Sequence, residues 1–297
     1  MFESLVANLL NRFLGAYIEN FDQNSLNIGI WSGDVKLKNL RLKKESLDKF
    51  NLPLDVKFGH LGELTLQIPW SNLKSKPVKV IIEDVYVLAS PVIVENLDPE
   101  EEHKREVQAK QQKLAALEEI QKAMLQNQSI TDDISSNETF AELLITKIVD
   151  NLQITIKNIH IRYEDDSLLT ENPYSIGATL DELSAVSADG LWIPSFISIT
   201  QAFTHKLLIL KSLSCYMNTD SGSIYSEDSE ELLENFRVAI HKHDSAEPAK
   251  KNLQYLLNPV SGKGRLTVHK GGATESHPHV KGEFFFEEFS IDLDSDQ

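Results

Sequence analysis

The residues of this chain that could do chemistry do not assemble into a catalytic motif. His241 with His243, and His277 with His279, have a spacing seen in metal sites, but no cysteine lies near either pair. The segment Ser261-Gly262-Lys263-Gly264 has a single G-x-G spacing before a strand pattern, which is more typical of a tight turn than of a phosphate-binding loop. We therefore expect solvated histidines and a turn at these positions.

The remaining reactive groups also have structural interpretations. Cys215 lies within a strand pattern and is expected to be a core thiol. Asp292, Asp294 and Asp296 are spaced like the first ligands of a calcium loop, but the glycine and the distal glutamate of such a loop do not follow. The sequence therefore predicts a chain that is not an enzyme, with no catalytic residues, no metal site and no cofactor.

Charge separates the chain into two unequal parts. The 297 residues are 41% hydrophobic and 25% charged, which is ordinary for a globular protein, and the net charge is 29 − 45 = −16. Such acidity disfavours nucleic acid as a partner. Residues 1–94 carry 11 basic and 10 acidic side chains, whereas the remainder carries 18 and 35. The neutral first third is therefore the part expected to approach an anionic surface.

Basic side chains gather within residues 36–57 of that neutral part. They are interpreted either as the solvated face of a strand or as a contact with lipid headgroups. The candidate membrane-proximal basic residues are Lys36, Lys38, Arg41, Lys43 and Lys44.

Compartment signals indicate the cytoplasm. The single cysteine allows no internal disulfide, which favours a reducing environment. The chain begins without a basic leader and an apolar run, and no stretch approaches the 18 apolar residues of a membrane span. We therefore expect a chain with no secretory signal and no transmembrane segment.

Two kinds of hydrophobic periodicity follow one another in the first 94 residues. Apolar residues recur at three-four spacing over residues 1–19, which predicts a helix. Its polar face holds Arg12 against Glu3 and Glu19, so it lacks the basic face of a membrane-surface helix, and we predict that it caps the end of the sheet. Residues 26–91 alternate with period two, which predicts strands. Residues 1–94 are thus expected to form one region.

The rest of the chain is expected to form two further regions. Residues 95–150 are predicted to hold a long helix over 98–128, a polar linker and a short helix at about 139–150. Residues 151–297 are predicted to continue the strands, with loop insertions and a short helix near 232–240.

One strand pattern recurs six times: apolar, any, apolar, any, polar, apolar, any, apolar. Its polar positions are Asn39, Asp84, Asn158, Glu182, Ser212 and Glu288. Each half of the pattern alternates as a strand does, but the alternation shifts by one residue at the polar position, which we call a slip. Such a slip would turn all later apolar side chains to the other face of the sheet. A β-bulge that takes up the extra residue would keep them on the same face. Chance is the alternative explanation, and the polar residue at every slip argues against it. The pattern predicts bent strands in a strongly curved antiparallel sheet, in an α+β fold dominated by β-structure.

The predicted sheet has more apolar surface than the predicted helices cover. About nine strands and three or four helices are expected, so an apolar face lacks an evident partner within the chain. Closure into a barrel, an additional protein partner, or an apolar ligand in an open trough would each solve this problem.

Several motifs of this chain resemble the N-terminal chorein region of the vacuolar protein sorting-associated protein 13 family. They are Leu9-Leu10-Asn11-Arg12-Phe13-Leu14-Gly15, Gly29-Ile30-Trp31-Ser32-Gly33, Val35 to Leu40, Leu52-Pro53, Gly59-His60-Leu61-Gly62, Ile68-Pro69-Trp70 and the strand between Pro77 and Pro91. Residues 158–165 are also similar to the family. Chains of that family are several times longer, so we expect this chain to be an N-terminal fragment.

The resemblance implies a bridge-like lipid transfer protein whose curved sheet forms an apolar trough, capped by the N-terminal helix. The implied partners are glycerophospholipids, a membrane surface on the endoplasmic reticulum side and the remainder of the same chain, at organelle contact sites. The alternative is a non-enzymatic scaffold or adaptor in membrane trafficking, with a sheet that packs its own core. The apolar halves that precede the slips, with one regular strand, supply the predicted concave, lipid-binding lining: Leu37, Leu64, Leu66, Ile68, Val80, Ile82, Ile154, Ile156, Leu208 and Leu210.

Overall fold

The chain divides into two compact units, one formed by residues 1–91 and 146–297 and the other by residues 92–145. The computed structural model describes residues 14–15, 17–19, 32–44, 54–73, 75–91, 107, 147–165, 174–197, 202–219, 222–241, 253–270, 272 and 278–292. All of these except residue 107 belong to the first unit. The predicted division at residues 94 and 150 stays a prediction.

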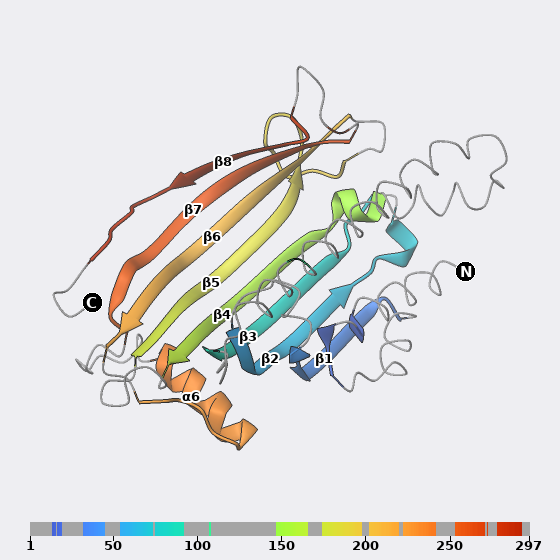
Figure 1. The fold of residues 1–297 in the computed structure, drawn as a ribbon. Helices are drawn as coiled ribbons and strands as arrows, with labels where there is room; N and C mark the ends of the chain where they lie inside the picture. Colours follow the sequence, from blue (N-terminus) through green and yellow to red (C-terminus); the bar gives the residue numbers. More distant parts are fainter. Residues whose placement is uncertain are drawn as a thin grey trace. The chain divides into compact units, whose positions relative to one another are not determined.

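The described residues of the first unit form one open sheet of eight strands, in the order β1 to β8 (Figure 1). The strands are β1 (Asp34–Arg41), β2 (Leu54–Gln67), β3 (Lys79–Pro91), β4 (Gln153–Asp165), β5 (Tyr174–Ala188), β6 (Phe203–Asn218), β7 (Tyr255–His269) and β8 (Val280–Phe286). A 3-10 helix η1 (Trp70–Asn72) follows β2, a helical turn at residues 147–151 precedes β4, and α6 (Ser229–His241) follows β6. The β-dominated fold class is thus confirmed, as are the helix predicted near 232–240 and helical structure at 147–151.

Three parts of the predicted architecture are wrong. The turn expected at residues 261–264 is part of strand β7. The sheet is neither strongly curled nor closed, because β1 and β8 are its free edges (Figure 1). It is also not wholly antiparallel, since β3 and β4 pair in parallel. A parallel neighbour requires a crossover of a dozen or more residues, and residues 92–152 supply that length between the two strands.

The phase slips correspond to residues with a left-handed backbone. Asn39, Asp84, Asn158 and Ser212 have φ angles of 52°, 61°, 53° and 53°. This conformation costs a non-glycine residue about 1–2 kcal/mol, and short polar side chains tolerate it best. Four of the six predicted slips therefore coincide with a real distortion of the strand, whereas the described Glu182 does not have this conformation.

The distortions run across the sheet in one row. On either side of the first one, Lys38 lies opposite Glu63 and Leu40 lies opposite Leu61, so neither strand has gained a residue. Most pairs at the level of this row stay in register without the predicted bulge, and this explains why the sheet does not curl strongly. The register shifts at Ser212 and just beyond it, between β6 and β7, and away from the row between Val56 and Phe58, where β2 pairs with β3.

Part of the predicted N-terminal helix contacts this sheet. Leu14 and Ile18 are buried against apolar side chains of β1 to β3, and residue 18 forms an antiparallel bridge with Leu42. Residues 1–13 lie outside the described residues, and so does the helix predicted at 98–128 except for residue 107. The proposal that the helix caps the sheet therefore stays a prediction.

The row of left-handed residues Asn39, Asp84, Asn158 and Ser212 predicts that glycine is more stabilising than a β-branched residue at these strand positions. Ser212→Gly should leave the free energy of unfolding unchanged or raise it, because glycine adopts this φ without strain. Ser212→Val should lower it by about 1–2 kcal/mol, since a β-branched residue tolerates the conformation poorly. At Thr155, a strand position without a positive φ, the order should reverse. Urea denaturation measures all four variants, and the same order at both positions would contradict the account.

Candidate functional site

Apolar residues form continuous rows across one face of the sheet. Residues directly opposite each other on paired strands project from the same face. One row, read through the register from β1 to β8, is Leu37, Leu64, Ile82, Ile156, Leu183, Leu210, Gly262 and Phe286. The neighbouring row is Val35, Leu66, Val80, Ile154, Ala185, Leu208, Gly264 and Phe284. We call the side of the sheet that carries both rows the apolar face.

The apolar face continues beyond the left-handed row. The next paired residues are Leu40, Leu61, Val85, Ile159 and Leu180. In β1 to β3 these side chains pack in the same cluster as the first row. The apolar side chains before and after each left-handed residue therefore project from the same face of the sheet.

This face differs in exposure between its two ends. From β1 to β3 its side chains form a packed cluster with Leu14 and Ile18, in which Val35 is 1% exposed. From β4 to β8 the side chains are mostly half-buried or exposed, and Ile161 and Phe284 are 48% and 61% exposed. Apolar surface thus remains accessible on the β4–β8 part.

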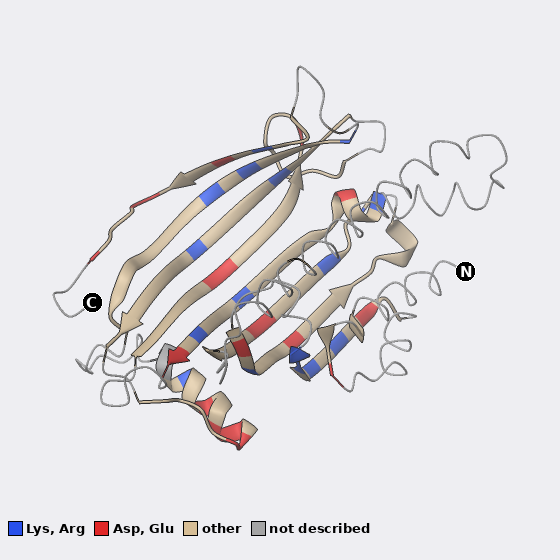
Figure 2. Cartoon of the chain, in the orientation of Figure 1, with Lys and Arg blue, Asp and Glu red and all other residues tan. Residues whose placement is uncertain are grey.

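Charged residues lie along most strands of the sheet (Figure 2). Strand alternation places those next to the apolar rows on the opposite face, which we call the polar face. Successive strands place Lys38, Glu63, Glu83, Lys157, Glu182 and Lys211 side by side in one row. Ion pairs join Lys157 to Glu83 and Lys211 to Glu182, each at 2.8 Å. Strand alternation thus separates apolar and charged side chains onto two faces.

Helix α6 packs on the polar face. Its Phe236 is fully buried, and its ring lies 5.3 Å from the ring of Tyr86 and 5.2 Å from that of His160. The Nε2 atom of His160 is 2.7 Å from the Tyr216 hydroxyl. Burial lowers the pKa of His160 to about 3, and the charge of Arg162 contributes to the shift. Among the described elements, a helix therefore covers part of the polar face, and none covers the β4–β8 part of the apolar face.

Comparison with known proteins places this two-faced sheet in a family. The whole chain, residues 1–297, matches the model of the VPS13-like family N-terminal region. The chain belongs to this family. It is 42% identical to the intermembrane lipid transfer protein VPS13 of Chaetomium thermophilum, over 100% of this chain and 9% of that protein. It is 36% identical to VPS13A of Mus musculus and 33% identical to VPS13C of Homo sapiens, over 91% and 92% of this chain and 8% of each relative. The chain therefore spans about a tenth of the length of these relatives.

Two motifs that resemble the VPS13-like family meet at the start of the sheet. The backbone N–H of Ile68 donates to the carbonyl of Gly33 at 2.7 Å. Gly33 has a φ of 81°, and a Cβ atom there would lie 2.6 Å from the carbonyl oxygen of Ile68. Only glycine fits this contact without displacement, which gives the motif glycine a structural reason.

All ten predicted lining residues of this VPS13-like chain lie on the apolar face. Leu37, Leu64, Leu66 and Ile68 are buried within the packed cluster, and Val80 and Ile82 pack against it. The other four, on β4 and β6, are half-buried. The prediction missed Leu183, which follows the slip at Glu182, because it took only the half of a pattern that precedes the slip. It also left out Phe286, although this residue precedes the slip at Glu288. Whether any of these residues contacts a lipid stays a prediction.

The predicted basic residues mostly have partners within the protein. The ammonium groups of Lys36 and Lys38 each lie 3.3 Å from the carboxylate of Glu63. Hydrogen bonds from Thr65 and from these two lysines lower the pKa of Glu63. Arg41 donates to the hydroxyl of Ser229 at 3.0 Å, and Lys43 donates to the carbonyl of Gly15 at 2.5 Å. Their contact with a membrane stays a prediction.

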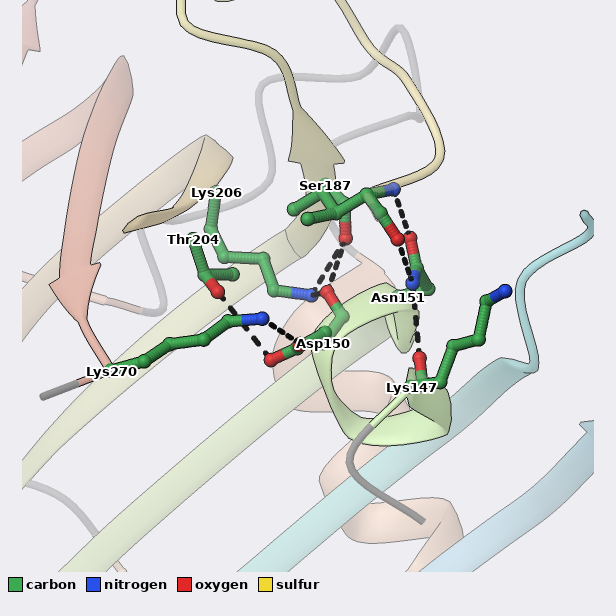
Figure 3. A network of polar contacts seen from close by, with 8 residues as sticks. Lys147, Asp150, Asn151, Ser187, Thr204, Lys206 and Lys270 are labelled. Carbon is green, nitrogen blue, oxygen red and sulfur yellow. Dashed lines mark hydrogen bonds and ion pairs between the residues drawn. The ribbon is translucent and has the colours of Figure 1, made fainter. Parts of the chain in front are cut away.

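A polar network closes the end of the sheet at which β4 begins (Figure 3). The ammonium group of Lys206 donates to the carbonyls of Asp150 and Leu152 and to the hydroxyl of Ser187, at 2.8, 2.9 and 2.8 Å. Lys270 pairs with the carboxylate of Asp150. Burial lowers the pKa of Lys206 to about 8, although the Asp150 carboxylate opposes the shift. Because all three protons of Lys206 are used, the network anchors the 147–151 turn to the sheet and does not offer that ammonium group to a ligand.

In the part of the chain that the structure describes, no group of three or more His, Cys, Asp or Glu side chains could hold a metal ion. No helix in that part is both long enough and apolar enough to cross a membrane.

The buried histidine predicts a specific dependence of stability on pH. Since the pKa of His160 falls from 6.5 to about 3 on folding, its contribution is complete above pH 6.5 and is lost as the pH falls towards 3. Between pH 7 and pH 5 the wild type should lose about 2 kcal/mol more stability than His160→Gln, which does not titrate. Urea denaturation at the two pH values measures this difference, and equal losses would refute the assignment.

Proposed function

We propose that this chain binds glycerophospholipids through their acyl chains on the β4–β8 part of the apolar face. In the full-length protein this binding would serve non-vesicular lipid transfer between membranes at organelle contact sites, with the endoplasmic reticulum as one of them. The observation that carries the proposal is the pair of apolar rows that cross all eight strands and stay accessible from β4 onwards. The names of the relatives as intermembrane lipid transfer proteins support it.

The chemistry of the face favours acyl chains over a polar ligand. Each methylene group removed from water contributes about 0.8 kcal/mol, and this contribution has no direction. The described residues of the two rows offer side chains such as Ile154, Ile156, Leu183 and Leu208, without a charged group among them. We therefore expect lipids to be held with little selectivity for the headgroup.

A scaffold function is the second candidate. The packed cluster between β1 and β3 supports it, because there the sheet does form a core of its own with Leu14 and Ile18. Native mass spectrometry of the purified chain distinguishes the two functions: bound phospholipid supports lipid carriage, and a lipid-free protein supports the scaffold.

A matched pair of double variants tests lipid carriage directly. Ile156→Glu with Leu210→Glu places two charges on the apolar face, whereas Thr155→Glu with Ile209→Glu places two on the polar face of the same strands. The first variant should retain less than about a tenth of the bound phospholipid, because burying a charge against acyl chains is strongly unfavourable. The second should load as the wild type does.

Lipid extraction followed by phosphate analysis measures the loading, and circular dichroism checks that both variants fold. Equal loading of the two folded variants would show that lipid does not lie on the apolar face.

A further inference from the structure

The loop between β5 and β6 exposes large apolar side chains. Leu191 is 80% exposed and Ile193 is 58% exposed. Soluble proteins bury such residues where they can, and exposed apolar side chains that cluster on one element mark a contact site. These two flank Trp192, so three consecutive large apolar residues lie at the end of a strand.

The loop holds these residues rigidly. One carboxylate oxygen of Asp189 accepts hydrogen bonds from the backbone N–H groups of Leu191 and Ile193, at 2.9 and 3.0 Å. Trp192 has a φ of 66°, an unfavourable value for a bulky residue. Its ring is fixed by His205 at 5.1 Å and by the guanidinium group of Arg265 at 5.2 Å. A strained backbone maintained in this way indicates that the exposure of Leu191 and Ile193 is built into the fold.

Lysines lie at the same end of the sheet as this loop. We call it the lysine end: here β2 and β5 end, and β3, β4 and β6 begin. Lys76, Lys79 and Lys147 form no ion pair with any acid that the structure describes, and Figure 3 shows the ammonium group of Lys147 pointing away from the neighbouring network. The 147–151 turn adds a further exposed apolar side chain, Val149, at 58%.

Two of these lysines face a hollow large enough for polar groups of a ligand. Its volume is about 670 Å³, and Lys76 and Lys79 line it together with Gln67, Gln153 and Asp34. Strand pairing places four of these residues side by side at the ends of β1 to β4, in the order Asp34, Gln67, Lys79 and Gln153. Ammonium and amide donors at such a strand end suit the phosphate oxygens of lipid headgroups.

The opposite end of the sheet is richer in acids, although Arg41 and Arg237 also lie there. Helix α6 and the residues just before it expose the acids Glu227, Asp228, Glu230, Glu231 and Glu234. In a chain of net charge −16, the lysine end is therefore the end of the described sheet that an anionic surface would attract.

We propose that the lysine end docks on the surface of an anionic bilayer, with Leu191 and Ile193 entering the boundary between headgroups and acyl chains. Lys76, Lys79 and Lys147 then contact lipid phosphates around the inserted loop. A bilayer fits better than a protein partner, because exposed aliphatic side chains and lysines lie at the same end of the sheet. Lys76 and Lys79 have no ion pair with a described acid, and the ammonium group of Lys147 lies 5.2 Å from the centroid of the Phe196 ring. This docking surface is distinct from the apolar face and goes beyond the binding of transported lipid.

The first test compares two double variants of equal charge. Leu191→Asp with Ile193→Asp changes the lysine end, and Tyr225→Asp with Val238→Asp changes exposed apolar residues at the α6 end, where Tyr225 is 52% and Val238 is 43% exposed. Flotation with vesicles of phosphatidylcholine and phosphatidylserine measures binding. The first variant should bind about tenfold more weakly or worse, since each aliphatic side chain that inserts contributes about one order of magnitude. The second should bind within about twofold of the wild type.

A fluorescent probe tests insertion independently. In a Cys215→Ser background, an environment-sensitive dye is attached at Leu191→Cys or at Val238→Cys. Its emission should shift to the blue with vesicles only at position 191, and the shift should decrease at high salt or with vesicles of phosphatidylcholine alone. Unchanged emission at position 191, or equal binding of the two double variants, would overturn the proposal. So would a dimer in solution that Leu191→Asp with Ile193→Asp dissociates.

Lipid loading separates this inference from the proposed function. Leu191→Asp with Ile193→Asp should still carry as much extractable phospholipid as the wild type, because the loop lies outside the rows of the apolar face. Lost loading with retained vesicle binding would overturn the docking surface, whereas a chain that never carries lipid but docks through Leu191 would contradict only the proposed function.

Discussion

The two-faced sheet depends on strict alternation of side chains in strands that are too long to stay straight. Strands of 13 to 16 residues accumulate twist, and a distortion in one strand alone would break its register with both neighbours. Here Asn39 of β1, Asp84 of β3 and Asn158 of β4 take the left-handed conformation at the same level of the sheet. The distortion therefore crosses the sheet as one line, and hydrogen bonding and the apolar face both continue through it.

Polar groups along this line form hydrogen bonds with each other. The side-chain amide of Asn158 donates to the carboxylate of Asp84 at 2.9 Å, and the backbone N–H of Ser212 donates to the hydroxyl of Ser261 at 3.1 Å. Ion pairs such as Lys157 with Glu83 lie beside them on the polar face. The same residues that preserve the apolar face thus give the opposite face its polar character, and α6 covers that face with Phe236.

Sequence periodicity predicted the apolar face well but not its shape. The phase slip at Asn39 or Asp84 is visible in sequence because alternation is local, and it correctly assigned Leu37 and Ile82 to one face. It did not reveal that neighbouring strands slip at the same level, which is a property of pairing, so a strongly curved sheet with bulges was predicted instead. The parallel pairing of β3 with β4 was also invisible, because it depends on where the chain returns after residue 91. The exposed Leu191 has no periodic signal, since its exposure arises from hydrogen bonds within one loop.

A crystal structure of the chain loaded with acyl-brominated phospholipid would show whether acyl chains lie against the β4–β8 part of the apolar face. Anomalous scattering distinguishes the bromine atoms from all lighter atoms, so their positions do not depend on how the lipid density is interpreted. The account predicts bromine peaks in contact with the rows that contain Ile156, Leu183 and Leu210. Bromine peaks on the polar face beneath α6, or a loaded protein whose bromines avoid these rows, would contradict it.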